Sequence, residues 1–169
     1  TDEAYQQVQG NNPDGTNNPA YEDYLDIDNY ITYLLMNFWA GNSDWRSHNW
    51  YAGRMRGPNS TGFKSYSWDA EWTVDMRSSL TNNSVDDSNG ITDDWLIKPQ
   101  TSLVLNSEYA LRFADQAQRF MFNDGVLSPT ATLAMYQALA DKVEASVIAE
   151  SARWGDVAQT PPFTLANWT

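Results

Sequence analysis

The feature that most constrains the fold is a long amphipathic helix predicted from Asp26 to Gly41. Its apolar residues recur at spacings of three and four, which places them on one face: Ile27, Tyr30, Ile31, Leu34, Leu35, Phe38 and Trp39. Asp26 suits the N-cap, because its carboxylate can accept hydrogen bonds from the first-turn amides. Gly41 suits the left-handed residue that ends a helix. The stripe is wide and its side chains are large, so we expect this helix at the centre of the core.

The rest of the chain predicts two more helices and one hairpin. Short strands are expected over 50–55 and 63–68, because a turn-rich segment, 56–62, separates them. One helix is expected from a Ser107 cap through 123. Another is expected from a Ser128 cap to about 151, with Gly155 as its stop. Residues 77–94 are rich in Ser, Asn and Asp, which favours an exposed excursion. The fold class expected is α+β, mainly α-helical, with a small hairpin at about 50–68.

The expected domain organisation is a polar lead-in over 1–22 followed by a single helical domain over 23–169. The chain has 169 residues, a usual length for one domain. Turn-forming residues crowd 11–19, which predicts a loop. Its Asn and Asp residues could suggest a calcium loop, but Asp14 is the only acid there, which favours a solvated loop.

Composition narrows the classes of function. Ten basic and 22 acidic residues give a net charge of −12, which disfavours nucleic-acid binding because such a surface repels phosphates. The absence of Cys excludes disulfides and thiolate sites, and a single His48 excludes His triads and multi-His metal sites. No apolar run is long enough to span a membrane. Acidity, few Lys and abundant Asn, Trp and Tyr suit a secreted or a salt-adapted protein, and we expect a secreted or cell-surface bacterial location. The sequence leaves the oligomeric state open.

One spacing points to chemistry. Asp44 precedes Asn49 by five positions, just after the long helix and just before the hairpin, and Asp69 comes after the second strand. Phosphoryl transfer from ATP uses one carboxylate to accept the proton of the attacking hydroxyl, with an amide oxygen and a second carboxylate on Mg²⁺. Protein kinases supply these parts in the order D-x-x-x-x-N, hairpin, Asp. Asp44, Asn49 and Asp69 occur in the same order.

The hairpin gives this spacing a geometric reason. Asn49 precedes one strand and Asp69 comes after its partner, so antiparallel pairing brings both to the open end, where strands lie about 4.8 Å apart. Both side chains could then reach one Mg²⁺ or Mn²⁺ at a solvent-accessible point near Asp44, with Glu71 as an additional ligand. The alternative is structural. Asp44 and Asn49 could be turn residues that bind backbone amides, with Asp69 capping the next segment.

Several segments together resemble the CotH family, the spore coat protein H-like atypical protein kinases. The resemblance rests on the acidic helix start at 26–30, the G-N-S-D loop at 41–44, N-W-Y at 49–51 and W-D-A-E-W at 68–72. Residues 150–156 also look like the end of bacterial CotH-like domains. The match is good over 23–75 and looser over 106–156.

The resemblance implies a divergent protein-kinase fold that transfers phosphate from ATP to Ser or Thr of a partner protein. By it, Asp44 is the catalytic residue, and Asn49 and Asp69 bind the metal and nucleotide. The loop reads N-S-D rather than H-R-D, and the metal element reads W-D-A-E rather than D-F-G. No glycine-rich loop or ATP-pairing Lys precedes Asp44. The sequence is therefore expected to represent the large lobe, inactive without the nucleotide-covering lobe.

Two other functions remain open on the sequence. Exposed Trp and Tyr side chains could make this acidic domain a non-catalytic extracellular module that binds carbohydrate or protein, although such modules are usually β-sandwiches. A glycosidase could use Asp44 and Asp69 as its carboxylate pair. That mechanism gives Asn49 no role, so it ranks last. The residues Arg153, Trp154 and Asp156 are expected to form a structural tie, with the Arg stacked on an aromatic ring.

Overall fold

The computed structural model describes residues 1–46, 48–74, 81, 83–85 and 96–168. It is α-rich with a small two-stranded antiparallel sheet, so the expected α+β class is confirmed at that level. The chain divides into two compact units, Thr1–Ala117 and Gln118–Thr169. The predicted excursion at 77–94 falls almost entirely outside the described residues.

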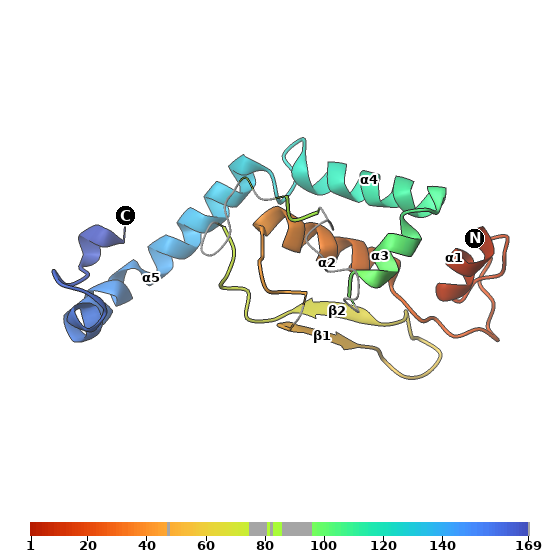
Figure 1. The fold of residues 1–169 in the computed structure, drawn as a ribbon, viewed down its shortest axis with the longest axis horizontal. Coiled ribbons are helices and arrows are strands. Elements are labelled where there is room, and N and C mark those ends of the chain that lie inside the picture. The colour runs from red at the N-terminus through yellow and green to blue at the C-terminus, as the bar shows by residue number, and fades with distance from the viewer. Residues whose placement is uncertain (47, 75–80, 82, 86–95, 169) are drawn as a thin grey trace. The chain divides into compact units, whose positions relative to one another are not determined.

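The first unit is built around helix α2, Ile27–Ala40, as the apolar stripe predicts (Figure 1). Asp26 accepts a hydrogen bond from the Asn29 amide at 3.0 Å, and Gly41 has a left-handed backbone, so both predicted caps are confirmed. Most of the stripe is buried, but Trp39 is 42% exposed. Tyr33 and Asn37 are buried off the stripe, because α2 is covered on more than one side.

The hairpin packs against α2 (Figure 1). Strand β1 is Trp50–Gly53 and strand β2 is Lys64–Ser67, paired antiparallel with Tyr51 opposite Tyr66. The predicted hairpin is confirmed, with shorter strands than expected. The segment before α2 runs beside the start of β2, where Leu25 and Phe63 form a parallel bridge. This contact joins the start of α2 to the hairpin.

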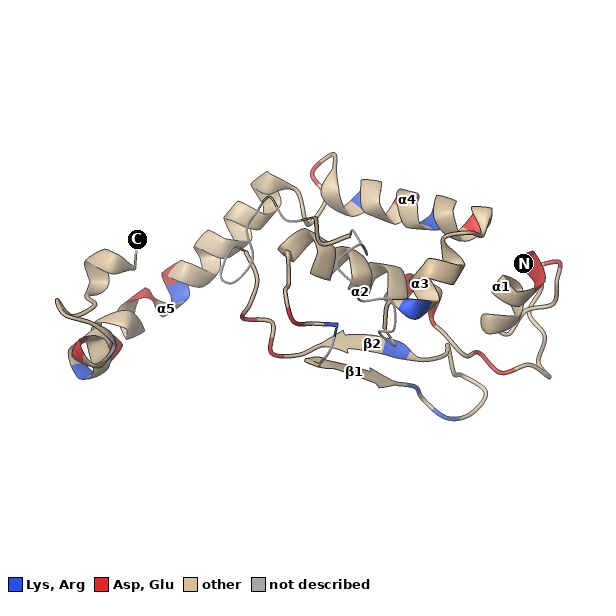
Figure 2. Cartoon of the chain, in the orientation of Figure 1, with Lys and Arg blue, Asp and Glu red and all other residues tan. Residues whose placement is uncertain are grey.

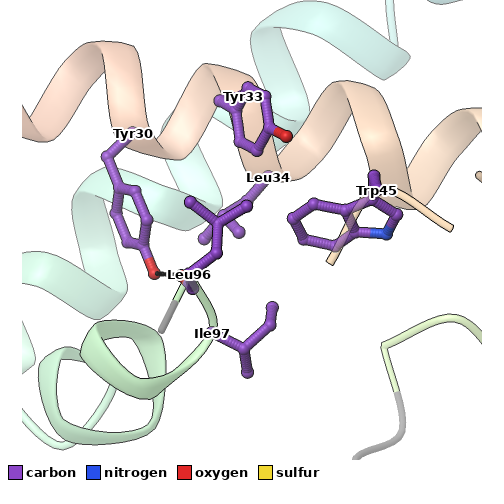
Figure 3. Close-up of a cluster of buried hydrophobic side chains, with 6 residues drawn as sticks. All are labelled: Tyr30, Tyr33, Leu34, Trp45, Leu96 and Ile97. Atoms are coloured by element: carbon purple, nitrogen blue, oxygen red, sulfur yellow. Dashed lines mark hydrogen bonds between the residues drawn. The ribbon is translucent and has the colours of Figure 1, made fainter. Parts of the chain in front are cut away.

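The core gathers side chains from distant segments (Figure 3). Tyr30, Tyr33 and Leu34 of α2 meet Trp45 from the loop after the helix, and Leu96 and Ile97 from a segment about 60 residues later. The Tyr30 hydroxyl donates to the Leu96 carbonyl at 2.6 Å and accepts from the Gln100 amide at 3.1 Å. The second bond reaches α3, Lys98–Leu103. Sequence periodicity did not predict α3, which is too short to show a stripe.

Residues 1–22 differ from the expected lead-in, because Asp2–Val8 forms helix α1. Tyr5 is 3% exposed and makes an edge-to-face contact with Tyr109 of α4, Ser107–Met121. Gln6 donates to Glu108 at 2.8 Å. The loop predicted at 11–19 is confirmed as turns. Whether 23–169 form one domain stays a prediction.

Helix α4 also packs on α2 through polar contacts. Arg112 donates to Asp28 at 2.7 Å and to Gln9 at 2.9 Å, and Gln116 donates to Asp28 at 2.6 Å. The hydrogen bond and the positive charge of Arg112 lower the pKa of Asp28.

The predicted Ser107 cap is wrong. Asn106 caps α4, because its side chain accepts from the Tyr109 amide at 2.9 Å.

The second unit is dominated by α5, Pro129–Ala158, where Ser128 caps the helix and Pro129 is its first residue, as predicted. The predicted stop at Gly155 is wrong. A Cβ at Gly155 would lie 2.3 Å from the Phe163 carbonyl oxygen, so the glycine permits the returning chain and its helix η2, Leu165–Asn167, to approach. The apolar side chains of α5 are largely exposed, including Leu133 and Tyr136. Arg153 stacks over Trp154 at 4.9 Å, as expected.

Charged residues are dispersed along the described chain, and the hairpin with its connecting loop carries Arg54, Arg56 and Lys64 but no acidic residue (Figure 2). Within the described residues, no helix is long and apolar enough to cross a bilayer.

Three glycine variants test the contact between the hairpin and the start of α2. Gly62 has φ +88, and a Cβ there would lie 2.6 Å from the Leu25 nitrogen. Gly57 has φ +103 with open space around it, and Gly53 has neither constraint. We expect Gly53→Ala to leave stability unchanged, Gly57→Ala to cost about 1 kcal/mol of unfolding free energy, and Gly62→Ala to cost about 3 kcal/mol. Urea unfolding measures all three. Equal losses at Gly57 and Gly62 would contradict the packing described.

The Asp28–Arg112 pair predicts how stability depends on pH. Because its pKa is lowered in the folded state, Asp28 contributes stability that is present above the unfolded value of about 3.9 and is lost as pH falls through the folded value. Asp28→Asn should therefore show a smaller fall in melting temperature than wild type below about pH 4. Asp115→Asn, which removes an exposed carboxylate from α4, should keep the wild-type profile. Parallel curves for wild type and Asp28→Asn would refute the role of the pair.

Candidate active site

The candidate site begins in the loop that leaves the C-terminal end of α2. Gly41 turns the chain with φ 58, and Asp44 and Trp45 come shortly after it in buried positions. Trp45 is 1% exposed, with its ring edge-on to Tyr33 at 5.6 Å and to Phe38 at 5.7 Å. Since Trp45 is the neighbour of Asp44, its burial fixes the backbone position from which the carboxylate extends.

A second segment holds this loop from the other side. The Ser43 amide donates to the Trp72 carbonyl at 3.1 Å, and the Val74 amide donates to the Ala40 carbonyl at 2.9 Å. The chain just past Asp69 and Glu71 is thereby tied to the loop that carries Asp44. Sequence spacing predicted that these two stretches share a site, and the backbone places them next to each other.

Asp44 and Asn49 are in direct contact. The Asn49 side-chain amide donates to Asp44 Oδ2 at 2.8 Å. His48 Nε2 lies 3.7 Å from the same oxygen. Asp44 Oδ1 is buried and has no hydrogen-bond partner among the described residues. Among the described residues, the carboxylate accepts a hydrogen bond from a side chain, and the structural alternative, in which it binds backbone amides, stays a prediction. Asp44 is only 8% exposed, in contrast to the solvent-accessible point expected.

Asp69 lies at the open end of the hairpin, as predicted. The Trp68 amide donates to the Asn49 carbonyl at 3.1 Å, so Trp68 lies opposite Asn49. Asp69 is the next residue along the chain. Asp69 and Glu71 are exposed, and no hydrogen bond or ion pair in the described part of the chain joins them to Asp44 or Asn49. Their role as metal ligands stays a prediction.

The donor set suits a hard cation in its chemistry. Asn49, Asp69 and Glu71 offer amide and carboxylate oxygens, which Mg²⁺ and Mn²⁺ prefer. No group of three acidic or His side chains in the described residues could hold a metal by itself. Mg²⁺ commonly binds one or two carboxylates and takes its remaining ligands from water and phosphate. By ligand type alone, these residues therefore fit an ion that takes its other ligands from outside this set.

Strained backbone concentrates around the site. Asn49 has φ 66, Asp69 has φ 53 and Val74 has φ 49. Asn and Asp tolerate this left-handed conformation, but it is unusual for a β-branched residue. Such outliers persist where surrounding structure imposes them, and they cluster at functional sites. At Val74 the imposing contact is the hydrogen bond to Ala40.

Two buried polar residues in this region were not predicted from the sequence to belong to the site. Asn37 is 1% exposed within α2, and Asn42 is 4% exposed in the loop. Asn42 belongs to the G-N-S-D motif, but nothing in the motif indicates its partner. The one available signal for Asn37 is an amide in an otherwise apolar part of the helix.

The hairpin also presents an aromatic face beside the site. Tyr51 and Tyr66 are cross-strand partners and are 59% and 52% exposed. Trp68 is 58% exposed, and its ring contacts Tyr51 edge-on at 5.8 Å. These three residues, termed the aromatic face below, adjoin the hairpin end that carries Asn49 and Asp69.

Relief of strain at Val74 provides a test of this geometry. The Val74 side chain is 66% exposed, so replacement loses little packing. We expect Val74→Asn to raise the free energy of unfolding by about 1 kcal/mol, because Asn tolerates the left-handed conformation. Val104→Asn is the control, since Val104 is exposed with φ −61, and it should change little. Chemical denaturation measures both, and a destabilised Val74→Asn would contradict the strained backbone.

No curated protein and no solved structure matches the chain. Residues 2–169 match the family described as CotH kinase protein, a match that covers the helix α1 segment as well as the two loops that carry Asp44 and Asp69. This chain belongs to the CotH kinase protein family.

Proposed function

We propose that this chain carries the large-lobe part of a protein kinase that transfers phosphate from Mg·ATP to Ser or Thr of a partner protein. The observation that carries the proposal is the state of Asp44. One carboxylate oxygen is held by Asn49, and the other is buried without a partner in the described residues. A carboxylate anchored through one oxygen can accept a proton through the other.

In this proposal Asp44 accepts the proton of the attacking hydroxyl, and Asn49 both orients Asp44 and offers its amide oxygen to the metal. Asp69, with Glu71 as an additional ligand, supplies the carboxylate on the metal side. Bound Mg²⁺ would neutralise charge on the transferred phosphate. Because Asp44 Oδ1 is buried, the Ser or Thr hydroxyl of the partner protein can reach it only if the residues that cover this oxygen move.

The aromatic face supports a nucleotide at this end of the hairpin. Exposed aromatic rings stack on purines, and such stacking is worth about 1–3 kcal/mol per base in nucleic-acid complexes. Tyr51 and Trp68 lie next to the positions proposed to hold the metal. Transfer also requires a lobe that covers the nucleotide, and no motif in this sequence supplies one. We therefore propose that this part alone transfers phosphate poorly. The acidic composition, with few Lys, supports the further proposal that the partner protein is met at the cell surface or outside the cell.

The aromatic face also favours a second candidate function. Exposed Tyr and Trp rings stack on sugars, so a non-catalytic module that binds glycan could use Tyr51, Tyr66 and Trp68. The two functions differ in what they require of Asp44. A glycan platform has no use for a buried carboxylate, whereas phosphoryl transfer depends on it.

One set of measurements separates the two functions. Tryptophan fluorescence is followed during titration with ATP in MgCl₂ or MnCl₂, and separately with cellopentaose and chitopentaose. Phosphoryl transfer from labelled ATP is followed on the protein itself and on casein, in the longest chain that the gene encodes. We expect a metal-dependent response to ATP. Asp44→Asn should keep that response but lower transfer by at least about 100-fold, a usual effect of losing a catalytic base.

Variants assign the remaining roles. Asp69→Asn should weaken the metal dependence of ATP binding, and Asp115→Asn, at an exposed position on α4, should behave as wild type. Far-ultraviolet circular dichroism confirms that each variant is folded. A fluorescence response to glycan but not to ATP favours the binding module. If Asp44→Asn transfers phosphate as fast as wild type, Asp44 is not the general base.

A further inference from the structure

Asn37 is a buried amide that the proposed chemistry does not use. It lies in α2 at 1% exposure, among the most buried side chains of the described residues. A polar group in such a place costs free energy unless its hydrogen bonds are made. A Leu there could fill similar space without that requirement. The partners of Asn37 therefore indicate what the amide contributes.

Both ends of the Asn37 side chain are engaged. Its Nδ2 donates to the Tyr33 carbonyl at 2.9 Å, which fixes the side chain against its own helix. Its Oδ1 accepts from Asn42 Nδ2 at 2.9 Å. The Asn37 backbone carbonyl also accepts from the Asn42 amide at 3.1 Å. Asn42 is thus attached to one residue of α2 through both its backbone and its side chain.

The attachment continues to Asp44. Asn42 Oδ1 accepts from the Asp44 amide at 3.4 Å, a longer bond than the others. Because Asn42 Nδ2 is already committed to Asn37, its Oδ1 has to face the Asp44 side of the loop. Rotation of the amide by half a turn would break both contacts. We term this series, from Tyr33 through Asn37 and Asn42 to the Asp44 amide, the amide relay.

From this geometry we infer that Asn37 is a positioning residue, which sets the place of the Asp44 carboxylate through Asn42. The inference rests on the proposed function of Asp44 as the base. Helix α2 holds Asn37 in a fixed position, and the hydrogen bonds from Asn37 to Asn42 and from Asn42 to the Asp44 amide fix the loop relative to the helix. The buried ring of Trp45 limits movement of the same loop. Preorganisation of this kind affects rate more than binding, since a misplaced base lowers reactivity without changing nucleotide contacts.

The test compares Asn37→Leu with Leu35→Val, a core change on the same helix at 3% exposure that leaves the relay intact. In the transfer assay, Asn37→Leu should lower kcat about 10- to 100-fold and leave KM for ATP within about threefold. Leu35→Val should leave kcat within about twofold at temperatures well below its melting point. Asn37→Leu combined with Asn42→Leu should be no worse than either alone, because residues of one relay are not additive.

A second readout does not depend on activity. Amide hydrogen exchange, followed by NMR, should be at least about tenfold faster at the Asp44 amide in Asn37→Leu than in Leu35→Val, after correction for global stability. If wild type transfers no phosphate, the proposed function fails while faster exchange still supports the relay. An unchanged exchange rate at Asp44 overturns the relay. So does a kcat effect equal to that of Leu35→Val, or full additivity with Asn42→Leu.

Discussion

The burial of Trp45 against α2 is the contact on which the candidate site depends. Its ring lies edge-on to Tyr33 and Phe38 of the helix, in a buried cluster that also contains Leu96 and Ile97 from a distant segment. An aromatic side chain of this size contributes a large buried area, so the loop that carries it has one strongly preferred position. Asp44, the preceding residue, therefore emerges at a defined place beside Asn49. Within that place, the hydrogen bonds from Asn37 through Asn42 set the position of the Asp44 amide.

Strain around the site results from this packing. The chain has to turn sharply at Gly41, enter the hairpin at Asn49, leave it at Asp69 and return to the loop at Val74. Each turn uses a left-handed residue, and Val74 is an unfavourable choice for one. The cost is offset by hydrogen bonds that this path permits, from Ser43 to Trp72 and from Val74 to Ala40. The same bonds bring the two acidic stretches of the candidate site together.

The two faces of the hairpin differ, since one packs against α2 and the other is exposed. Ser65, on the inner face, is buried, and its amide donates to Asn29 of α2 at 2.6 Å, so this face fixes the hairpin to the helix. The outer face, with Tyr51, Tyr66 and Trp68, is left open. Alternation along a strand separates the two faces completely. A ligand could therefore occupy the aromatic face without disturbing the contacts that position Asn49 and Asp69.

The sequence by itself determined the features that depend on neighbouring residues. Helix α2 with both its caps, the hairpin and the Ser128 cap of α5 are local patterns, because periodicity and capping act within a few residues. The spacing of Asp44, Asn49 and Asp69, with the motifs around it, also identified the family. Only the tertiary structure decided the use of residues whose partners are distant in sequence. Helix α1 is held by contacts to α4, and Gly155 is required by Phe163 rather than by a helix end. The amide of Asn37 could not be assigned from its neighbours, because a buried hydrogen bond is defined by the group that folding brings to it, and that group was the side chain of Asn42.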